Sequence, residues 1–247
     1  PAAYDTYGND IAEAHYHHFK ADVIISLIDV WVLKSFGKKD WHWIPYMPID
    51  SETSAGVPPN KILDALDGAY RVVSYAKYGE RALNKAGVAN TLIPHGVDTK
   101  IFYPSDRDKA RAKFKFSDAD FTVGMVAANK GVPSRKAFPE NLQALAIFKQ
   151  RHPKVKTKLY LHTTEGTQAA GVDMTALLLD LGFKKEDVTF VHQYQYLLGL
   201  DETYMADAYN AMDVLLAASM SEGLEIPLIE AQACGTPVIT TNFSAMP

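Results

Sequence analysis

Short apolar, β-branched runs alternate with helix-forming segments along the chain of 247 residues. Strands alternating with helices form parallel sheets joined by right-handed crossovers. In the first half, strands are predicted at 21–27, 44–49, 71–75 and 91–94, with helices at 61–66 and 78–86. In the second half, strands are predicted at 121–127, 157–162, 188–192, 214–217 and 237–240, with helices at 139–151, 174–181, 202–211 and 227–233. The alternation therefore predicts an α/β protein.

A polar segment, 105–120, interrupts the alternation with many charged residues. We interpret it as a short surface helix with a linker, where domain boundaries commonly fall. The chain is therefore predicted to form two Rossmann-like domains, 1–117 and 118–247. Ligands of such sheets bind beyond the carboxyl ends of the strands, so the expected site is a cleft between the two domains.

Charge is unevenly distributed. The net charge of −4 argues against a nucleic-acid-binding protein. Residues 129–158 contain eight Lys or Arg and a single acid, Glu140, whereas residues 186–247 contain no Lys or Arg. This asymmetry favours a local anion site, although two solvated faces of opposite charge would give the same pattern.

The single cysteine and the absence of a long apolar run favour a location in the cytoplasm, with peripheral contact to the inner membrane face as a variant.

Two glutamates stand eight residues apart in the segment 219–239. Glu222 follows the strand predicted at 214–217, and Glu230 lies about one turn into the helix that Pro227 opens. A carboxylate in this place can accept both hydroxyls of a ribose, and a helix N-terminus offers N–H groups to a diphosphate. The alternative is an ordinary cap and an exposed helical glutamate.

A basic loop follows the first strand of the second half. Lys130, Arg135 and Lys136 supply the fixed cations that a phosphate site needs at a strand end, and Gly131 supplies flexibility. Exposed basic residues in loops are usually solvated, so the loop is informative only together with the two glutamates.

The segment Ser219–Ile239 resembles the E-x7-E signature of retaining glycosyltransferases of family 4, which have the GT-B fold. The segments 71–83 and 93–104 resemble the end of the first domain of that family. The resemblance implies catalytic roles for Glu222, Lys130 and Lys136, and it implies that Glu230 binds the nucleotide ribose. It further implies donor contacts from Arg135, Gly223, Leu224 and Glu225.

Three positions depart from the family pattern. Lys130 stands where Arg is usual, which replaces a bidentate fork with a point charge. Glu225 stands where the family has a glycine, adding negative charge near the expected diphosphate, although an acid also suits a helix N-terminus. His95 replaces a common Asn, and we expect it to form part of the turn and to line the cleft, with catalysis as the alternative.

Asp29 and Asp50 follow apolar strands of the first half. We assign Asp50 to the catalytic set because the family often has a His or Asp near the sugar or the acceptor. For both Asp29 and Asp50, the alternative is an acid that only caps a helix or forms a turn.

A histidine cluster near the N-terminus is interpreted as exposed helix residues: His15, His17 and His18. No other ligands lie nearby in sequence, so no metal site is expected.

The resemblance predicts retaining transfer of a sugar from a nucleoside-diphosphate sugar to an acceptor hydroxyl, with no required cofactor. The acceptor is undefined. The alternatives are a non-catalytic or inactive nucleotide-sugar-binding fragment and a GT-B phosphorylase or epimerase. Against the family pattern, the glycine-rich N-terminal strand–loop and the closing C-terminal helices are absent from 1–247, so both domains are expected to be incomplete. Exposed sheet edges would then favour a homodimer.

Overall fold

The computed structural model describes residues 4–246, which pack as two compact units. Unit 1 contains residues 4–95 together with Ser221–Leu224 and Ser244–Met246. Unit 2 contains Gly96–Met220 and Glu225–Phe243. The E-x7-E motif is therefore divided, because Glu222 packs in unit 1 and Glu230 in unit 2.

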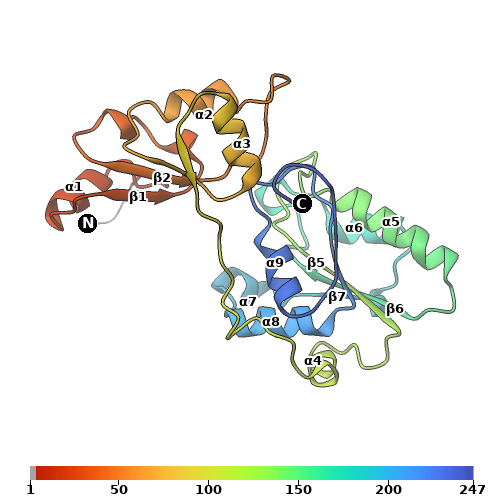
Figure 1. The fold of residues 1–247 in the computed structure, drawn as a ribbon. Coiled ribbons are helices and arrows are strands. Elements are labelled where there is room, and N and C mark those ends of the chain that lie inside the picture. The colour runs from red at the N-terminus through yellow and green to blue at the C-terminus, as the bar shows by residue number, and fades with distance from the viewer. Residues whose placement is uncertain (1–3, 247) are drawn as a thin grey trace. The chain divides into compact units, whose positions relative to one another are not determined.

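Unit 1 holds a four-stranded parallel sheet in the order β1-β2-β3-β4 (Figure 1). Its strands are β1 (Ile24–Leu27), β2 (Trp43–Met47), β3 (Val72–Ser74) and β4 (Asn90–Leu92). Its helices are α1 (Ala12–His18), α2 (Asn60–Ala65) and α3 (Lys77–Lys85), with 3₁₀ turns at Val30–Val32 and Phe36–Lys38. Trp43, Met47 and Leu83 are among the residues of the core between sheet and helices.

The edge strand β1 corrects one sequence-based expectation. The run 21–27 was predicted to form a buried strand, but Ile25 and Leu27 are more than 60% exposed. The strand is covered on one face only, so every second side chain points away from the core.

Unit 2 holds a five-stranded parallel sheet in the order β7-β6-β5-β8-β9. Its strands are β5 (Phe121–Val126), β6 (Thr157–His162), β7 (Val188–Phe190), β8 (Val214–Ala217) and β9 (Val238–Thr240). Its helices are α4 (Arg107–Lys113), α5 (Phe138–Arg151), α6 (Met174–Asp180), α7 (Gln193–Leu198), α8 (Glu202–Ala211) and α9 (Ile226–Ala233), with 3₁₀ turns at Gln168–Ala170 and Lys185–Asp187.

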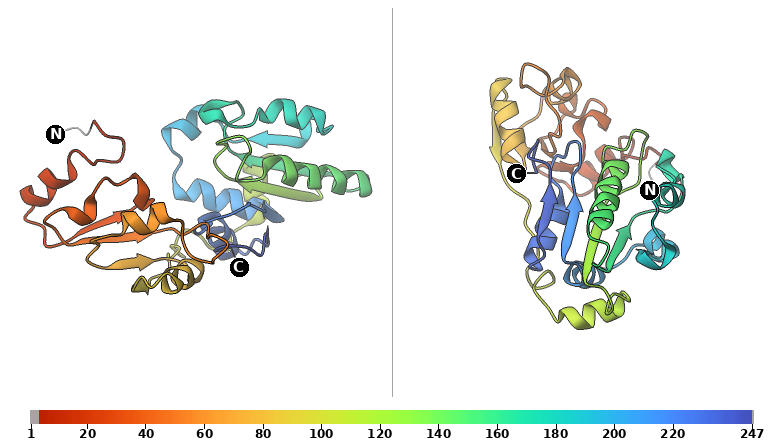
Figure 2. Two further views of the ribbon diagram at one scale, coloured as in Figure 1. Left: turned by 90° about the horizontal axis from the view of Figure 1, so that it is seen from above. Right: turned by 90° about the vertical axis from the view of Figure 1, so that its right-hand side faces the viewer.

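Helices cover both faces of the sheet of unit 2. Helices α5 and α6 lie together on one face, where Phe138, Leu142 and Met174 are fully buried in the core, and α8 and α9 lie on the other (Figures 1 and 2). Helix α4 packs against α8, and Arg107 and Arg111 both pair with Asp213 at the foot of β8. Strands β5 and β8 lie inside the sheet. The basic loop follows β5, and the segment with Glu222 and Glu225 follows β8 and leads into α9, which carries Glu230.

Candidate functional site

Strands β5 and β8 are hydrogen-bonded neighbours, so their carboxyl ends lie at the same edge of the sheet of unit 2. The basic loop 127–137 leaves β5 at this edge, and the segment from Ala218 to Glu225 leaves β8 beside it. The two loops are joined directly, since the backbone N–H of Met220 donates to the carbonyl of Arg135 at 2.9 Å. The carboxyl edge of a parallel sheet is the usual place for a ligand in this type of fold.

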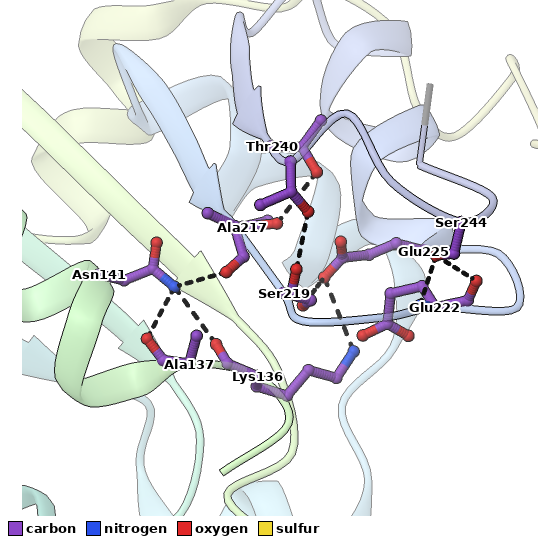
Figure 3. A network of polar contacts seen from close by, with 11 residues as sticks. Lys136, Ala137, Asn141, Ala217, Ser219, Glu222, Glu225, Thr240 and Ser244 are labelled. Carbon is purple, nitrogen blue, oxygen red and sulfur yellow. Dashed lines mark hydrogen bonds and ion pairs between the residues drawn. The ribbon is translucent and has the colours of Figure 1, made fainter. Parts of the chain in front are cut away.

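Lys136 and Glu225 form an ion pair at this edge (Figure 3). The distance from Lys136 Nζ to Glu225 Oε1 is 3.6 Å, and the side chain of Glu225 is 1% exposed while that of Lys136 is 17% exposed. The Ser219 hydroxyl donates to the same carboxylate oxygen at 3.2 Å. One cation and one anion of the predicted donor site are thus already in contact.

Glu225 does not play the helix-capping role that an acid in this place suggests. It occupies the N-cap position of α9, yet its side chain makes no capping hydrogen bond. The carboxylate turns instead towards Ser219 and Lys136, because a partly buried ammonium is a stronger partner than a backbone N–H.

The other two cations of the loop differ from Lys136 in burial. Arg135 and Lys130 have exposed side chains. The resemblance implies catalytic roles for both Lys130 and Lys136, but of these two only Lys136 forms an ion pair with the loop after β8 among the described residues.

Two buried asparagines hold the loops in place. Asn141, on α5, donates through Nδ2 to the carbonyls of Lys136, Ala137 and Ala218 (Figure 3). Asn129 donates to the carbonyls of Thr164, Gly166 and Val172, and its Oδ1 accepts the Val172 N–H at 2.8 Å. Neither asparagine was predicted from the sequence, although an Asn just after an apolar strand is a signal that could have pointed to Asn129.

Glu230 lies on α9 and is held by a tyrosine of the neighbouring helix. The Tyr209 hydroxyl donates to Glu230 Oε2 at 2.6 Å. Burial raises the pKa of Glu230, and the hydrogen bond from Tyr209 works against that rise. Its second oxygen, Oε1, has no hydrogen-bond partner within residues 4–246. Glu230 therefore has one fixed oxygen and one that can accept from a ligand.

Glu222, Gly223 and Leu224 belong to unit 1, together with Asp50. The Ser221 hydroxyl donates to the carbonyl of Asp50 at 2.5 Å, and the backbone N–H of Glu222 donates to the Ser244 hydroxyl at 2.9 Å. Glu222 is 5% exposed and Leu224 is half-buried. The start of the segment that carries these residues is thus held by the Ser221 side chain and by the backbone of Glu222.

Gly223 is required at its position by a close approach. A Cβ atom there would lie 2.3 Å from the Cβ of Pro48 and 3.4 Å from the Tyr75 hydroxyl. Any side chain would therefore displace the segment from the end of β2.

Aromatic side chains collect at the carboxyl edge of the sheet of unit 1. The ring of Tyr75 lies 5.4 Å from that of Tyr46 and 4.5 Å from that of His95. Burial raises the pKa of Tyr75, helped by the negative charges of Asp29, Asp50 and Glu222. Burial lowers the pKa of His95. From the sequence, His95 was expected to form part of the turn and to line the cleft, whereas the two tyrosines carry no sequence signal that singles them out.

No group of three or more potential metal ligands occurs within residues 4–246, and His15, His17 and His18 of α1 are exposed. Over the same residues, none of the helices has the length and apolar character needed to cross a membrane.

Residues 121–247 match the family model of glycosyl transferases group 1. D-Inositol 3-phosphate glycosyltransferase of Saccharomonospora viridis is 29% identical over 169 residues, which are 68% of this chain and 37% of that protein. The enzyme of the same name from Mycobacteroides abscessus is 30% identical over 167 residues, which are 67% and 34%. The chain thus spans about a third of the length of these relatives.

Two solved structures show the same fold. Sucrose-phosphate synthase from Thermosynechococcus elongatus matches with a TM-score of 0.72 at 21% identity, over 95% of this chain and 59% of that one. Anabaena HepE, solved in complex with UDP and glucose, matches with a TM-score of 0.71 at 17% identity, over 97% and 65%. The two parallel sheets, together with the similarity to these two structures, identify the fold as GT-B. Because the family model matches more than half of the residues, the chain belongs to the glycosyl transferases group 1 family.

Proposed function

We propose that the chain contributes to the transfer of a sugar from a nucleoside-diphosphate sugar to an acceptor hydroxyl with retention of configuration. Family membership supports the reaction class. The donor assignment rests on the parallel pairing of β5 with β8, which brings the basic loop with Lys136 and the segment that leads to Glu230 to one edge of the sheet. No cofactor beyond the donor substrate is needed for this chemistry.

In the proposed reaction, the bond between the anomeric carbon and the β-phosphate oxygen breaks, and its electron pair leaves with the diphosphate. Lys136, Arg135 and Lys130 stabilise that charge, which is the kind of term that contributes most in such reactions. The acceptor oxygen bonds to the anomeric carbon on the same face, and its proton passes to the departing phosphate oxygen.

The glutamates orient the donor. Glu230 accepts from the ribose hydroxyls through Oε1, and Glu222 orients the sugar. The backbone of Gly223 and Leu224 contacts the sugar and the phosphate. Asp50 lies at the end of β2, beside the segment that carries Glu222, and we assign it to the acceptor side of the reaction.

The test is release of nucleoside diphosphate from UDP-, GDP- and ADP-glucose and the corresponding mannose and N-acetylglucosamine donors, with and without acceptors. Inositol 3-phosphate leads the acceptor screen, because the sequence relatives are named for it. Retention is read from the anomeric signal of the product by NMR. An inverted product would contradict the proposed stereochemistry.

The pairing of Lys136 with a buried carboxylate favours one alternative, a non-catalytic nucleotide-sugar-binding protein, because Glu225 offsets a cation that transfer needs. Nucleotide binding without donor hydrolysis or transfer would support this alternative.

We further propose a homodimer formed through an exposed sheet edge, supported by the edge position of β1 in the sheet of unit 1. A monomer mass that does not change with concentration in light scattering would contradict the homodimer.

We also propose that the protein resides in the cytoplasm, with peripheral contact to the inner membrane face. Cell fractionation tests this location.

A further inference from the structure

Tyr209 is a fully buried tyrosine whose hydroxyl has one partner, the carboxylate of Glu230. It lies on α8 and is 0% exposed, with its ring packed against Phe102 at 6.1 Å between centroids. Burial and the neighbouring charge of Glu230 raise the pKa of Tyr209, so the hydroxyl keeps its proton and acts as the donor of the 2.6 Å bond.

The backbone of Tyr209 is held independently of this hydroxyl. The Thr236 hydroxyl donates to the Tyr209 carbonyl at 2.8 Å. The adjacent Asn210 donates to the carbonyls of Tyr103 and Ala206. The position of α8 next to α9 therefore does not depend on the bond from Tyr209 to Glu230, and removal of the hydroxyl should leave the fold intact.

A glutamate that binds a ribose must present one carboxylate oxygen in a defined direction. A free Glu side chain has three rotatable bonds, and fixing it in one conformation costs side-chain entropy. The bond to Tyr209 fixes Oε2 before any ligand arrives and leaves Oε1 available. The cost of ordering the side chain is then already met in the unbound protein, which is the general basis of preorganised binding.

We infer that Tyr209 is a positioning residue that sets Glu230 for recognition of the ribose hydroxyls, so that the chain distinguishes ribonucleoside from 2′-deoxyribonucleoside diphosphates. The inference rests on the proposed role of Glu230 and deepens it. Tyr209 touches no part of the donor and acts only through the carboxylate.

The test measures binding of UDP, GDP and ADP, and of their 2′-deoxy forms, by calorimetry on five proteins: wild type, Tyr209→Phe, Glu230→Gln, the double variant and Tyr204→Phe. Tyr204 is the matched control, because it undergoes the same change on the same helix but its hydroxyl pairs with that of Tyr160 instead of Glu230. Thermal melting of each variant confirms folding.

We expect Tyr209→Phe to weaken binding of the ribonucleotide about tenfold, in line with a hydrogen bond to a charged group. The 2′-deoxy form should lose less, because it presents only the 3′-hydroxyl to Glu230. The double variant should bind no more weakly than Glu230→Gln, because the tyrosine acts through the glutamate. Tyr204→Phe should bind as wild type does.

The failures are distinguishable. If the wild type binds a nucleoside diphosphate but Tyr209→Phe retains both its affinity and its preference for ribose, the role of Tyr209 is wrong and the donor site stands. Additive losses in the double variant, or equal losses for ribose and deoxyribose, would likewise overturn it. Absence of binding by the wild type to any of the diphosphates would overturn the proposed function itself.

Discussion

Replacing Glu225 with Gln should tighten the binding of nucleoside diphosphates. Glu225 stands where the related family has a glycine, and its carboxylate lies 3.6 Å from the ammonium of Lys136. Gln has nearly the same shape and keeps an oxygen that can accept from the Ser219 hydroxyl, which now donates to Glu225 at 3.2 Å. The substitution therefore removes one negative charge with little change in packing.

The magnitude follows from the distances. A phosphate oxygen bound to Lys136 would lie about 2.8 Å from Nζ, as charge-assisted hydrogen bonds do. With the ammonium 3.6 Å from Glu225 Oε1, the phosphate oxygen would be separated from that carboxylate by roughly 5–6 Å on the far side of Nζ. Two unit charges so placed repel by about 3 kcal/mol at an effective dielectric of 20. Salt screens part of this repulsion, and Lys136 is held less firmly once its carboxylate partner is gone. We therefore expect the binding free energy to improve by about 1.4 kcal/mol, which is a tenfold gain in affinity.

The assay is calorimetric titration of UDP, GDP and ADP at 50 and 300 mM salt, with Glu186→Gln as the control. Glu186 is an exposed glutamate of the 3₁₀ turn that precedes β7, so its replacement gives the same net charge without touching Lys136. The gain should be specific to Glu225→Gln and smaller at high salt. Unchanged or weaker binding by a normally folded Glu225→Gln protein would refute the reasoning and would mean that the carboxylate serves to hold Lys136 in its working position.

Three further outcomes are expected. Burial lowers the pKa of His162 to about 4, below the value of about 6.5 for an unfolded chain, so the unfolded state binds the extra proton between these values. Stability should be complete above pH 6.5 and should fall by up to about 3 kcal/mol as the pH drops towards 4, with a flatter profile in thermal melts of His162→Gln; equal slopes would contradict this. Burial raises the pKa of Cys234 to about 11, so iodoacetamide at pH 8 should label the thiol only after unfolding, and rapid labelling of the native protein would be inconsistent with it. Asn141→Ala should cost about 2–4 kcal/mol in urea unfolding, because it removes bonds to three carbonyls, and a loss below about 0.5 kcal/mol would show that those bonds do not hold the loops.

The regular elements were largely predictable, because strand and helix periodicity survive in the sequence. Strand β6 and helix α8 have the predicted bounds, Thr157–His162 and Glu202–Ala211. Helix α7 was missed, since exposed apolar residues such as Tyr194 and Leu197 disrupt the amphipathic pattern. The exposed face of β1 was also missed, because an apolar run does not reveal whether a strand lies at the edge of its sheet.

The sequence was enough to predict which charged residues lie at the candidate site, but not which of them contact each other. The sequence places Lys136, Glu225 and Glu230 in loops and a helix that follow neighbouring strands, and topology then brings those strand ends to one edge. It could not predict that Glu225 pairs with Lys136 instead of capping α9, since rotamers depend on burial. Nor could it predict Tyr209, because a buried tyrosine that serves a carboxylate has the same apolar pattern as one that only fills the core.

The central claim is that this chain binds a nucleoside diphosphate through Glu230. Titration of UDP, GDP and ADP into the wild type and into Glu230→Ala measures the affinities that test this claim. We expect saturable binding of at least one diphosphate by the wild type and a loss of tenfold or more in the variant, since truncation removes a charge-assisted acceptor. Absence of saturation by any diphosphate at millimolar concentration, or equal affinity of a folded Glu230→Ala protein, would contradict the central claim.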